Sequence, residues 1–336
     1  MRDPAYRTAI SESDVHDKRA LDAFRAKRAE WLHWLKWDEH HAISIAVSSM
    51  VWADVRFRAL ARAGEVEPDG GLNNPLVMEL LIEGHFATQT LAIRRLMDNP
   101  RSGVISLANL LKDIARNIGL FTRENFVAFD GLPYDYAAAR ARVVAEHVGR
   151  GPFWAAREGP DAWDTSERAH AMFDQLSGVV AANRNRTDRI PRKHIETLQQ
   201  WMVDSEAETI VDWADNFLAH AGDPRSRGRV DLAAVQPNLT KIENAVRCFV
   251  RVSEALLAYL LFDSGHGVVM PVPQFNQFER MDKPLVTNAR LREVRTLWDG
   301  LETERNGYLS GVLEEMLSAP PVAERVEDAT SVALRQ

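Results

Sequence analysis

Apolar residues recur every three to four positions along most of this chain, a spacing typical of helices that bury one face. Alternating apolar and polar runs of the kind that form strands are nearly absent. The pattern therefore predicts an all-α fold. We expect helices over residues 41–63, 75–98, 107–117, 134–148, 165–185, 191–220 and 238–262, preceded by one through Arg19, Phe24 and Trp31 and followed by one or two within 288–317.

Capping residues and helix breakers set the expected boundaries of these helices. Ser11 or Ser13 would cap the first helix, and no breaker separates it from the second, so the two could form one long helix. Ser106 would cap the helix at 107–117. The helix at 191–220 is unusually long, and we expect it to kink.

The distribution of helices and loops divides the chain into segments. We expect an N-terminal helix in residues 1–39 and a helical bundle in residues 40–262. Glycine and proline punctuate residues 119–164, which we interpret as an insertion or lid. Residues 263–318 would form a C-terminal helical extension, and residues 319–336 a disordered tail.

Composition narrows the classes of function. The net charge of −7 disfavours broad non-specific binding to nucleic acid but permits a local basic site. The only cysteine, Cys248, lies in an apolar helical pattern that predicts a core position. No apolar run approaches the ~18 residues that span a membrane, and the N-terminus lacks an apolar signal core, so we expect a cytoplasmic protein without membrane contact.

One histidine stands at the end of a predicted helix. Gly222 and Pro224 are helix-stop signals, so His220 falls in the last turn, where unpaired carbonyls favour its charged form. Asn216, four residues earlier, shares its face. A histidine in this position can exchange protons and meet an anion. The alternative is a capping histidine that bonds the last carbonyls of its own helix.

A second polar segment closes the helix at 75–98. Arg94 and Asp98 are four residues apart, so they can pair on one helical face, whereas Arg95 lies on another. The simple interpretation is a surface ion pair worth a few tenths of a kcal/mol. The functional interpretation is an Arg/Asp pair that lies next to His220 and binds a phosphate group.

These segments resemble the abortive-infection U branch of the HEPN superfamily. The similar motifs are Arg-Leu-x-Asp at residues 95–98, Ser-Leu at 106–107 and Ala-His at 219–220, followed by a small residue and later Asp223. The resemblance covers residues 40–262. It implies an antiparallel helical bundle with N- and C-terminal helical extensions, a homodimer whose two His-bearing helices face one groove, and metal-independent ribonuclease activity or a relative of it.

The chain departs from the family at one residue. The resemblance places the motif arginine, which binds the scissile phosphate, six residues before the histidine, and this chain has Ala214 there. Loss of such a cation costs on the order of 10²–10³ in rate. The resemblance implies that His220 is the acid–base residue and that Asn216, Arg94 and Asp98 surround the phosphate. The loop residues Arg225, Arg227 and Arg229 would contact RNA, and Arg94, Arg225 or Arg227 could replace the missing charge.

Two other clusters have simpler interpretations. Trp31, Trp34 and Trp37 are spaced three residues apart and form an aromatic stripe, which favours a packed core or a dimer interface over RNA stacking. Arg184 and Arg186 belong to a basic turn that we interpret as solvated. Phosphate-loop and zinc-binding motifs are absent, so we expect no cofactor and no metal.

The leading hypothesis is a HEPN-like protein of bacterial anti-phage or toxin–antitoxin defence that binds or cleaves RNA, with a defence-system or antitoxin protein as a further partner. The alternative is a catalytically inactive scaffold or sensor that acts through protein–protein contacts, which Ala214 and the tryptophan stripe favour. A third interpretation is an unrelated helical bundle in which the motifs coincide by chance. A separation of His220 from Arg94 beyond ~10 Å would support that interpretation, because direct charge assistance needs short range.

Overall fold

The structure, a computed structural model, describes residues 6–99, 103–148, 154, 156–218, 231, 235–279 and 288–318. Within these ranges the chain is all-helical, as the hydrophobic pattern predicts, with an isolated β-bridge between Thr122 and Arg189. The predicted tail at 319–336 lies outside the described residues.

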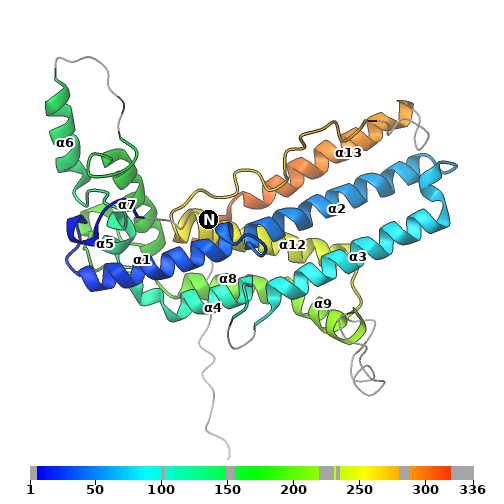
Figure 1. Ribbon diagram of the computed structural model, residues 1–336, viewed down its shortest axis with the longest axis horizontal. Coiled ribbons are helices and arrows are strands. Elements are labelled where there is room, and N and C mark those ends of the chain that lie inside the picture. The colour runs from blue at the N-terminus through cyan, green and yellow to red at the C-terminus, as the bar shows by residue number, and fades with distance from the viewer. Residues whose placement is uncertain are drawn as a thin grey trace, which may run out of the picture.

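The described α-helices are α1 (Lys18–Leu32), α2 (Ile43–Val66), α3 (Pro75–Met97), α4 (Leu107–Arg116), α5 (Arg123–Ala128), α6 (Tyr136–His147), α7 (Trp163–Ser177), α8 (Lys193–Asp204), α9 (Ala207–Trp213), α12 (Leu239–Glu254), α13 (Asn288–Asn306) and α14 (Val312–Ser318). Three π-helical segments, η2 (His33–Trp37), η6 (Ala214–Leu218) and η7 (Ala255–Leu260), continue α1, α9 and α12. Figure 1 shows α2 and α3 as a long antiparallel hairpin, with α13 lying along α2 and with α5, α6 and α7 gathered at the opposite end.

The first two helices are separate. Asp17, rather than Ser11 or Ser13, caps α1, and its carboxylate accepts from the backbone N–H groups of Arg19 and Ala20. After η2, the Asp38 carboxylate accepts from the backbone N–H groups of residues 40 and 41 at 3.0 and 2.6 Å. This local hydrogen bonding turns the chain before α2 begins. Residues 33–42 contain no Gly or Pro that would indicate the turn in the sequence.

The α2–α3 hairpin is held by one asparagine. Asn73 Nδ2 donates to the carbonyl of Gly64 at 2.7 Å and to two further carbonyls of the turn. A Cβ at Gly64 would lie 2.9 Å from Asn73 Oδ1, so this close approach requires glycine. Because α2 continues to Val66, Gly64 lies inside the helix rather than ending it. Ser106 caps α4 as predicted, because its hydroxyl accepts from the backbone N–H of Asn109.

Residues 119–164 differ from the predicted insertion or lid in their first part. All residues of α5 are buried, and Phe121 and Phe126 belong to the main hydrophobic core. Trp31 stacks on Phe121 with ring centroids 5.5 Å apart. Apolar side chains from α1 and α5 thus share one core, and glycine and proline in the surrounding loops mark the short turns between these elements.

The long helix expected at 191–220 is divided in two. Glu206 has a φ of 57°, which interrupts the helix between α8 and α9. Ser205 Oγ donates to the Met202 carbonyl at 2.6 Å and so satisfies a carbonyl at the break. The predicted kink is therefore confirmed. It directs α9 and η6 along α3, which positions the segment that leads toward residue 220.

Histidines whose pKa is lowered by the fold make its stability depend on pH. Burial lowers the pKa of His85, His170 and His266 to about 4, whereas an unfolded histidine titrates near 6.5. Between these values the unfolded chain binds more protons, so the free energy of unfolding is expected to fall as the pH drops from about 6.5 to about 4. At 1.36 kcal/mol per pKa unit, each histidine contributes up to about 3 kcal/mol to this fall.

Urea unfolding at several pH values between 7.5 and 4 measures this effect. The His170→Asn variant is the matched test, because it removes one of the three protonation equilibria and leaves the carboxylates unchanged. The slope of its unfolding free energy against pH is expected to be smaller by about one proton than that of the wild-type protein. An unchanged slope would show that His170 is not buried in its neutral form.

Candidate functional site

The described part of the predicted histidine helix ends two residues before His220. His220 and the loop residues Arg225, Arg227 and Arg229 lie outside the described residues. The ring of Trp213, the last residue of α9, stacks on that of Phe217 in η6 with centroids 6.1 Å apart, and this contact supports the π-helical turn.

The side chain of Asn216 is turned back onto its own helix. Its Nδ2 donates to the backbone carbonyl of Asp212 at 2.7 Å. This bond satisfies a carbonyl near the helix end, which is the role of a capping side chain. Asn216 is half-buried and this bond uses only its Nδ2, so its side-chain oxygen can still accept a hydrogen bond.

Arg94 pairs with a different acid from the one that the sequence suggested. Its Nε donates to Asp215 Oδ1, and this hydrogen bond raises the pKa of Arg94. Asp98 lies just beyond the last residue of α3, so the i to i+4 helical geometry that would join it to Arg94 is lost. The Asp98 backbone carbonyl instead accepts from Ser106 Oγ, which connects α3 to the start of α4. Among the described residues no hydrogen bond or ion pair joins the side chains of Arg94 and Asp98, although the charge of Asp98 also contributes to the raised pKa of Arg94.

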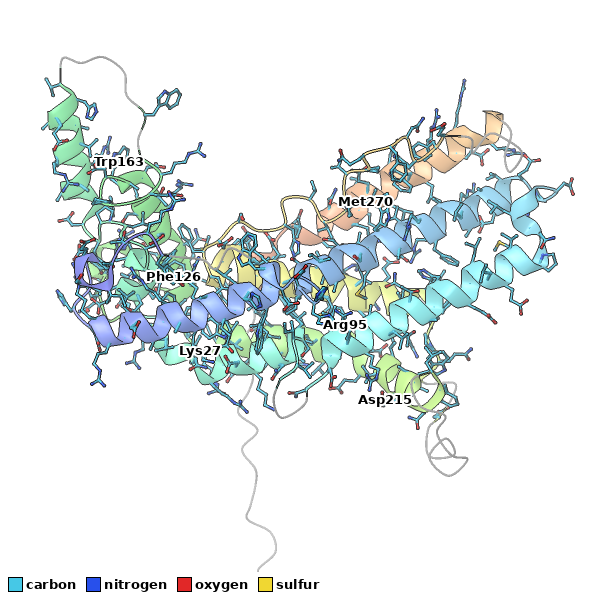
Figure 2. All side chains as sticks on the ribbon, viewed as in Figure 1. Lys27, Arg95, Phe126, Trp163, Asp215 and Met270 are labelled. Atoms are coloured by element: carbon cyan, nitrogen blue, oxygen red, sulfur yellow. The ribbon has the colours of Figure 1, made fainter. Side chains whose placement is uncertain are left out.

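The contact between Arg94 and Asp215 joins two segments that are far apart in the sequence. Figure 2 shows Asp215 on the segment that packs against α3, and Arg95 on α3 itself. The side chains of Arg94 and Asp215 are 32 and 42% exposed. Both charges therefore remain within reach of a solvent-borne anion, and Asp215 lies five residues before His220 in the sequence.

Two further cations lie at the junction of α3 and α4. Arg95 is exposed, and its guanidinium lies 3.3 Å from His41 Nδ1. Lys112 Nζ donates to Asn99 Oδ1 at 3.3 Å. Within the described part of the chain, neither cation has a carboxylate within ion-pair distance. We use the name cation cluster for Arg94, Arg95 and Lys112, which lie on α3 and α4 and contact three different neighbours, Asp215, His41 and Asn99.

The cation cluster can bind an anion but is incomplete as a catalytic site. Guanidinium groups suit phosphate because their planar N–H donors match its oxygens. Asp215 occupies Arg94 and would repel a phosphate, so an anion must displace that carboxylate or approach from the side of Arg95. A proton-transfer group is also required, and within the described residues the exposed His41 is the imidazole that contacts the cluster.

The largest ionic network was missed by the sequence interpretation. Arg305 donates to Asp54 Oδ2 at 2.8 Å, and Arg58 bridges Asp54 at 3.1 Å to Glu243 at 2.8 Å. Arg305 and Asp54 are 1% exposed, and burial raises the pKa of the neighbouring Tyr308 to about 12. The one available signal was an aspartate inside an apolar helical stripe, and its partner lies 251 residues away. The burial of the network assigns it to the fold rather than to ligand binding.

A buried serine and a half-buried histidine also lie within hydrogen-bond distance of each other. Ser253 Oγ is 2.8 Å from His266 Nε2, and the backbone N–H of His266 donates to Glu254 at 2.8 Å. Ser253 is fully buried, and its hydroxyl donates to the carbonyl of Val250. A nucleophile must reach its substrate, so this pair fixes the chain after α12 rather than performing catalysis.

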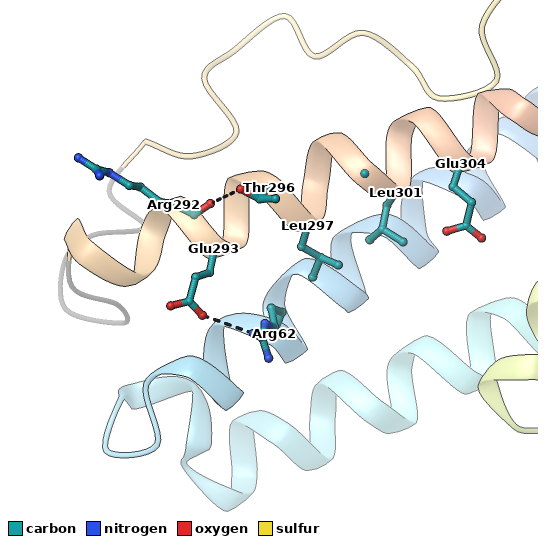
Figure 3. A pocket seen from close by; sticks show the side chains of 8 residues that line it. Arg62, Arg292, Glu293, Thr296, Leu297, Leu301 and Glu304 are labelled. Atoms are coloured by element: carbon teal, nitrogen blue, oxygen red, sulfur yellow. Dashed lines mark hydrogen bonds and ion pairs between the residues drawn. The ribbon is translucent and has the colours of Figure 1, made fainter.

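A cavity of about 630 Å³ lies between α2 and α13. Figure 3 shows Arg62 reaching Glu293 at one end, a contact of 3.4 Å, with Leu297 and Leu301 along the wall. Thr296 donates to the carbonyl of Arg292 within its own helix. The polar groups of this cavity are thus engaged with one another, and they form no cluster suited to catalysis.

The tryptophan stripe and the basic turn are explained by packing. Trp31 is fully buried and donates through Nε1 to Asp113 at 2.8 Å, whereas Trp37 is 47% exposed. The stripe thus passes from core to surface. Arg184 and Arg186 are paired with Asp174 and Asp14 at 2.6 and 2.9 Å, so neighbouring acids neutralise the basic turn.

The described residues contain no group of three or more His, Cys, Asp and Glu side chains that could hold a metal ion. In the same part of the chain, no helix has both the length and the apolar character required to cross a membrane. Neither a scan against protein-family models nor searches of curated proteins and of solved structures found a match.

Proposed function

We propose that this protein binds RNA at the cation cluster and cleaves it without a metal ion, as a HEPN-like protein of bacterial defence. The observation that carries the proposal is the contact of Arg94 with Asp215, since it supplies a cation close in space to the segment that precedes His220. The resemblance of residues 95–98, 106–107 and 219–220 to the HEPN family supplies the reaction class.

The burial of Ala214 explains why the charge comes from another helix. Ala214 is fully buried within η6, so an arginine at this position would have to place its guanidinium in the core. Arg94 approaches the same segment from α3 and keeps its charge at the surface. We therefore assign to Arg94 the phosphate contact that the family motif assigns to the missing arginine.

The proposed chemistry needs three kinds of group. His220 takes the proton from the RNA 2′-hydroxyl or gives one to the leaving oxygen, because a histidine titrates near neutral pH. Arg94 and Arg95 hold the phosphate and stabilise the charge that develops on it. Arg225, Arg227 and Arg229 follow the histidine in sequence and would contact the RNA backbone.

Two substitutions of one ion pair are expected to change RNA affinity in opposite directions. Arg94→Ala removes a phosphate contact, so it should weaken binding of single-stranded RNA. It should also reduce the slope of log affinity against log salt concentration by about one. Asp215→Asn releases Arg94 and removes a repelling charge, so it should strengthen binding. Fluorescence anisotropy of a labelled RNA in EDTA measures both effects.

Arg290→Ala serves as the control, because Arg290 is an exposed arginine paired with Glu293 on α13. It removes the same charge from a surface that the proposal does not use. Equal losses of affinity for Arg94→Ala and Arg290→Ala would show that the loss comes from the change in net charge, and they would contradict a site at the cation cluster.

A second candidate function is a catalytically inactive scaffold or sensor that binds other proteins. It is favoured by apolar side chains on the exposed face of α3, since Val77, Leu80 and Leu91 are 38, 72 and 47% exposed. Exposed apolar groups at helical spacing are suited to protein contacts, including the homodimer that the resemblance implies. Growth arrest on expression that His220→Ala abolishes would favour the ribonuclease, whereas growth arrest that is unchanged by His220→Ala would favour the scaffold.

A further inference from the structure

A second cavity, of about 350 Å³, lies between α2 and α3, away from the cation cluster. Its walls are largely apolar, and it is lined by Ala53, Arg56, Phe57, Leu60, Leu80, Leu81, Gly84, His85 and Thr88. A Cβ added at Gly84 would meet no atom within 4 Å, so this position leaves open space beside the pocket. The volume and the apolar lining are those of a site for a small molecule.

One polar side chain at this pocket has no hydrogen-bond partner. The His85 side chain is 2% exposed, and its ring lies parallel to that of Phe57 with centroids 4.0 Å apart. Neither His85 Nδ1 nor His85 Nε2 has a hydrogen-bond partner among the described protein groups. Leaving a buried polar group without a hydrogen bond is costly. A ligand that forms a hydrogen bond with this ring would remove that cost, which favours its binding.

The neighbouring aspartate does not satisfy His85. Asp54 Oδ1 is 3.9 Å from His85 Nε2, which is beyond hydrogen-bond distance. Arg58 and Arg305 already hold both Asp54 oxygens at 2.8–3.1 Å. Burial keeps the imidazole neutral at pH 7, because it lowers the pKa of His85 to about 4. The ring therefore offers one N–H donor and one nitrogen acceptor in different directions, and a hydroxyl group can accept from the first or donate to the second.

A cation also lines this pocket. Arg56 is exposed, and its guanidinium lies 5.4 Å from the ring centroid of Trp52. In the described ranges it has no carboxylate within ion-pair distance. An exposed guanidinium held over an aromatic ring can bind a carboxylate in bidentate geometry.

We propose that this pocket binds a small amphipathic anion, with its apolar body against Phe57 and the leucines, a hydroxyl group at His85 and a carboxylate at Arg56. Each feature of this ligand corresponds to one part of the pocket. Apolar side chains form the wall, the unpartnered donor and acceptor are buried, and the cation is exposed to solvent. This site is independent of the proposed RNA chemistry, because it uses none of the same residues.

Isothermal titration calorimetry of the full chain with three probes tests the match. 4-Hydroxyphenylacetate carries all three features, phenylacetate lacks the hydroxyl, and p-cresol lacks the carboxylate. We expect 4-hydroxyphenylacetate to bind about fivefold more tightly than either partial probe, the size of effect that one net hydrogen bond or exposed ion pair gives. Absence of binding by 4-hydroxyphenylacetate, or equal affinities for the three probes, would overturn the proposal.

Two variants assign the contacts. His85→Phe keeps an aromatic ring on Phe57 and should remove the preference for 4-hydroxyphenylacetate over phenylacetate. Arg56→Ala changes an exposed residue, so the fold should be kept, and it should remove the preference for 4-hydroxyphenylacetate over p-cresol. Arg62→Ala, which removes an exposed arginine of the same helix that does not line this pocket, is the control and should preserve both preferences. Unchanged preferences in Arg56→Ala would overturn the assignment even if His85→Phe failed to fold.

Discussion

Replacing Asp54 by alanine is expected to lower the free energy of unfolding by about 3–5 kcal/mol, the range for breaking a buried ion pair. The substitution removes from Arg305, which is 1% exposed, its buried carboxylate partner, and it also removes a partner of Arg58. Arg305 keeps contacts with Glu304 at 2.7 Å and Glu243 at 3.4 Å, but the part of the guanidinium that faced Asp54 is left buried without a partner, which is costly because it has lost its hydration. Urea unfolding at neutral pH, followed by circular dichroism, measures the change.

Arg62→Ala is the matched control for this network. Arg62 also connects α2 to α13, through Glu293 at 3.4 Å, but the two side chains are 43 and 38% exposed. Water screens such a pair, so we expect a loss within about 1 kcal/mol. A loss below about 1 kcal/mol for Asp54→Ala as well would contradict the assignment of the buried network as a main connection between these helices.

Replacing Trp31 by alanine is expected to cost about 3–5 kcal/mol, the range for removing a large aromatic side chain from a core. The indole is fully buried, stacks on Phe121 and donates to Asp113, so its loss leaves a cavity and removes one of the two hydrogen bonds to a carboxylate oxygen that Lys27 also contacts. Trp37→Ala tests the same substitution at the exposed end of the stripe, where Trp37 is 47% exposed, and should cost about 1 kcal/mol or less. Equal losses in the two variants would contradict the packing described for α1.

The positions of most helices could be predicted because each follows from local periodicity and capping. Ser106 and Asn238 cap α4 and α12 through side-chain bonds to the backbone three residues ahead, and such bonds are visible in the sequence as residue types. The positions of the breaks at Asp38 and Glu206 were not predicted. Asp is a residue type that caps and turns favour, so Asp38 was a signal without a neighbouring Gly or Pro to support it, whereas Glu206 is no such signal and its left-handed backbone depends on tertiary packing.

The candidate site was predictable only in part. The sequence singled out Arg94 from its helical position, but its partner Asp215 comes from a segment 121 residues away. That pair forms because α9 and η6 pack on α3, and the spacing of residues along the chain does not predict such a contact. The same limit applies to His85, because its isolation from Asp54 depends on Arg58 and on an arginine 251 residues from Asp54.

Cleavage of a labelled single-stranded RNA in the presence of EDTA tests the central claim, that His220 and Arg94 act on RNA without a metal ion, most directly. We expect the wild-type protein to cleave the RNA, His220→Ala and Arg94→Ala each to cleave it at least about 100-fold more slowly, and Arg290→Ala to cleave it at the wild-type rate. Absence of cleavage by the wild-type protein, or undiminished cleavage by His220→Ala, would contradict it.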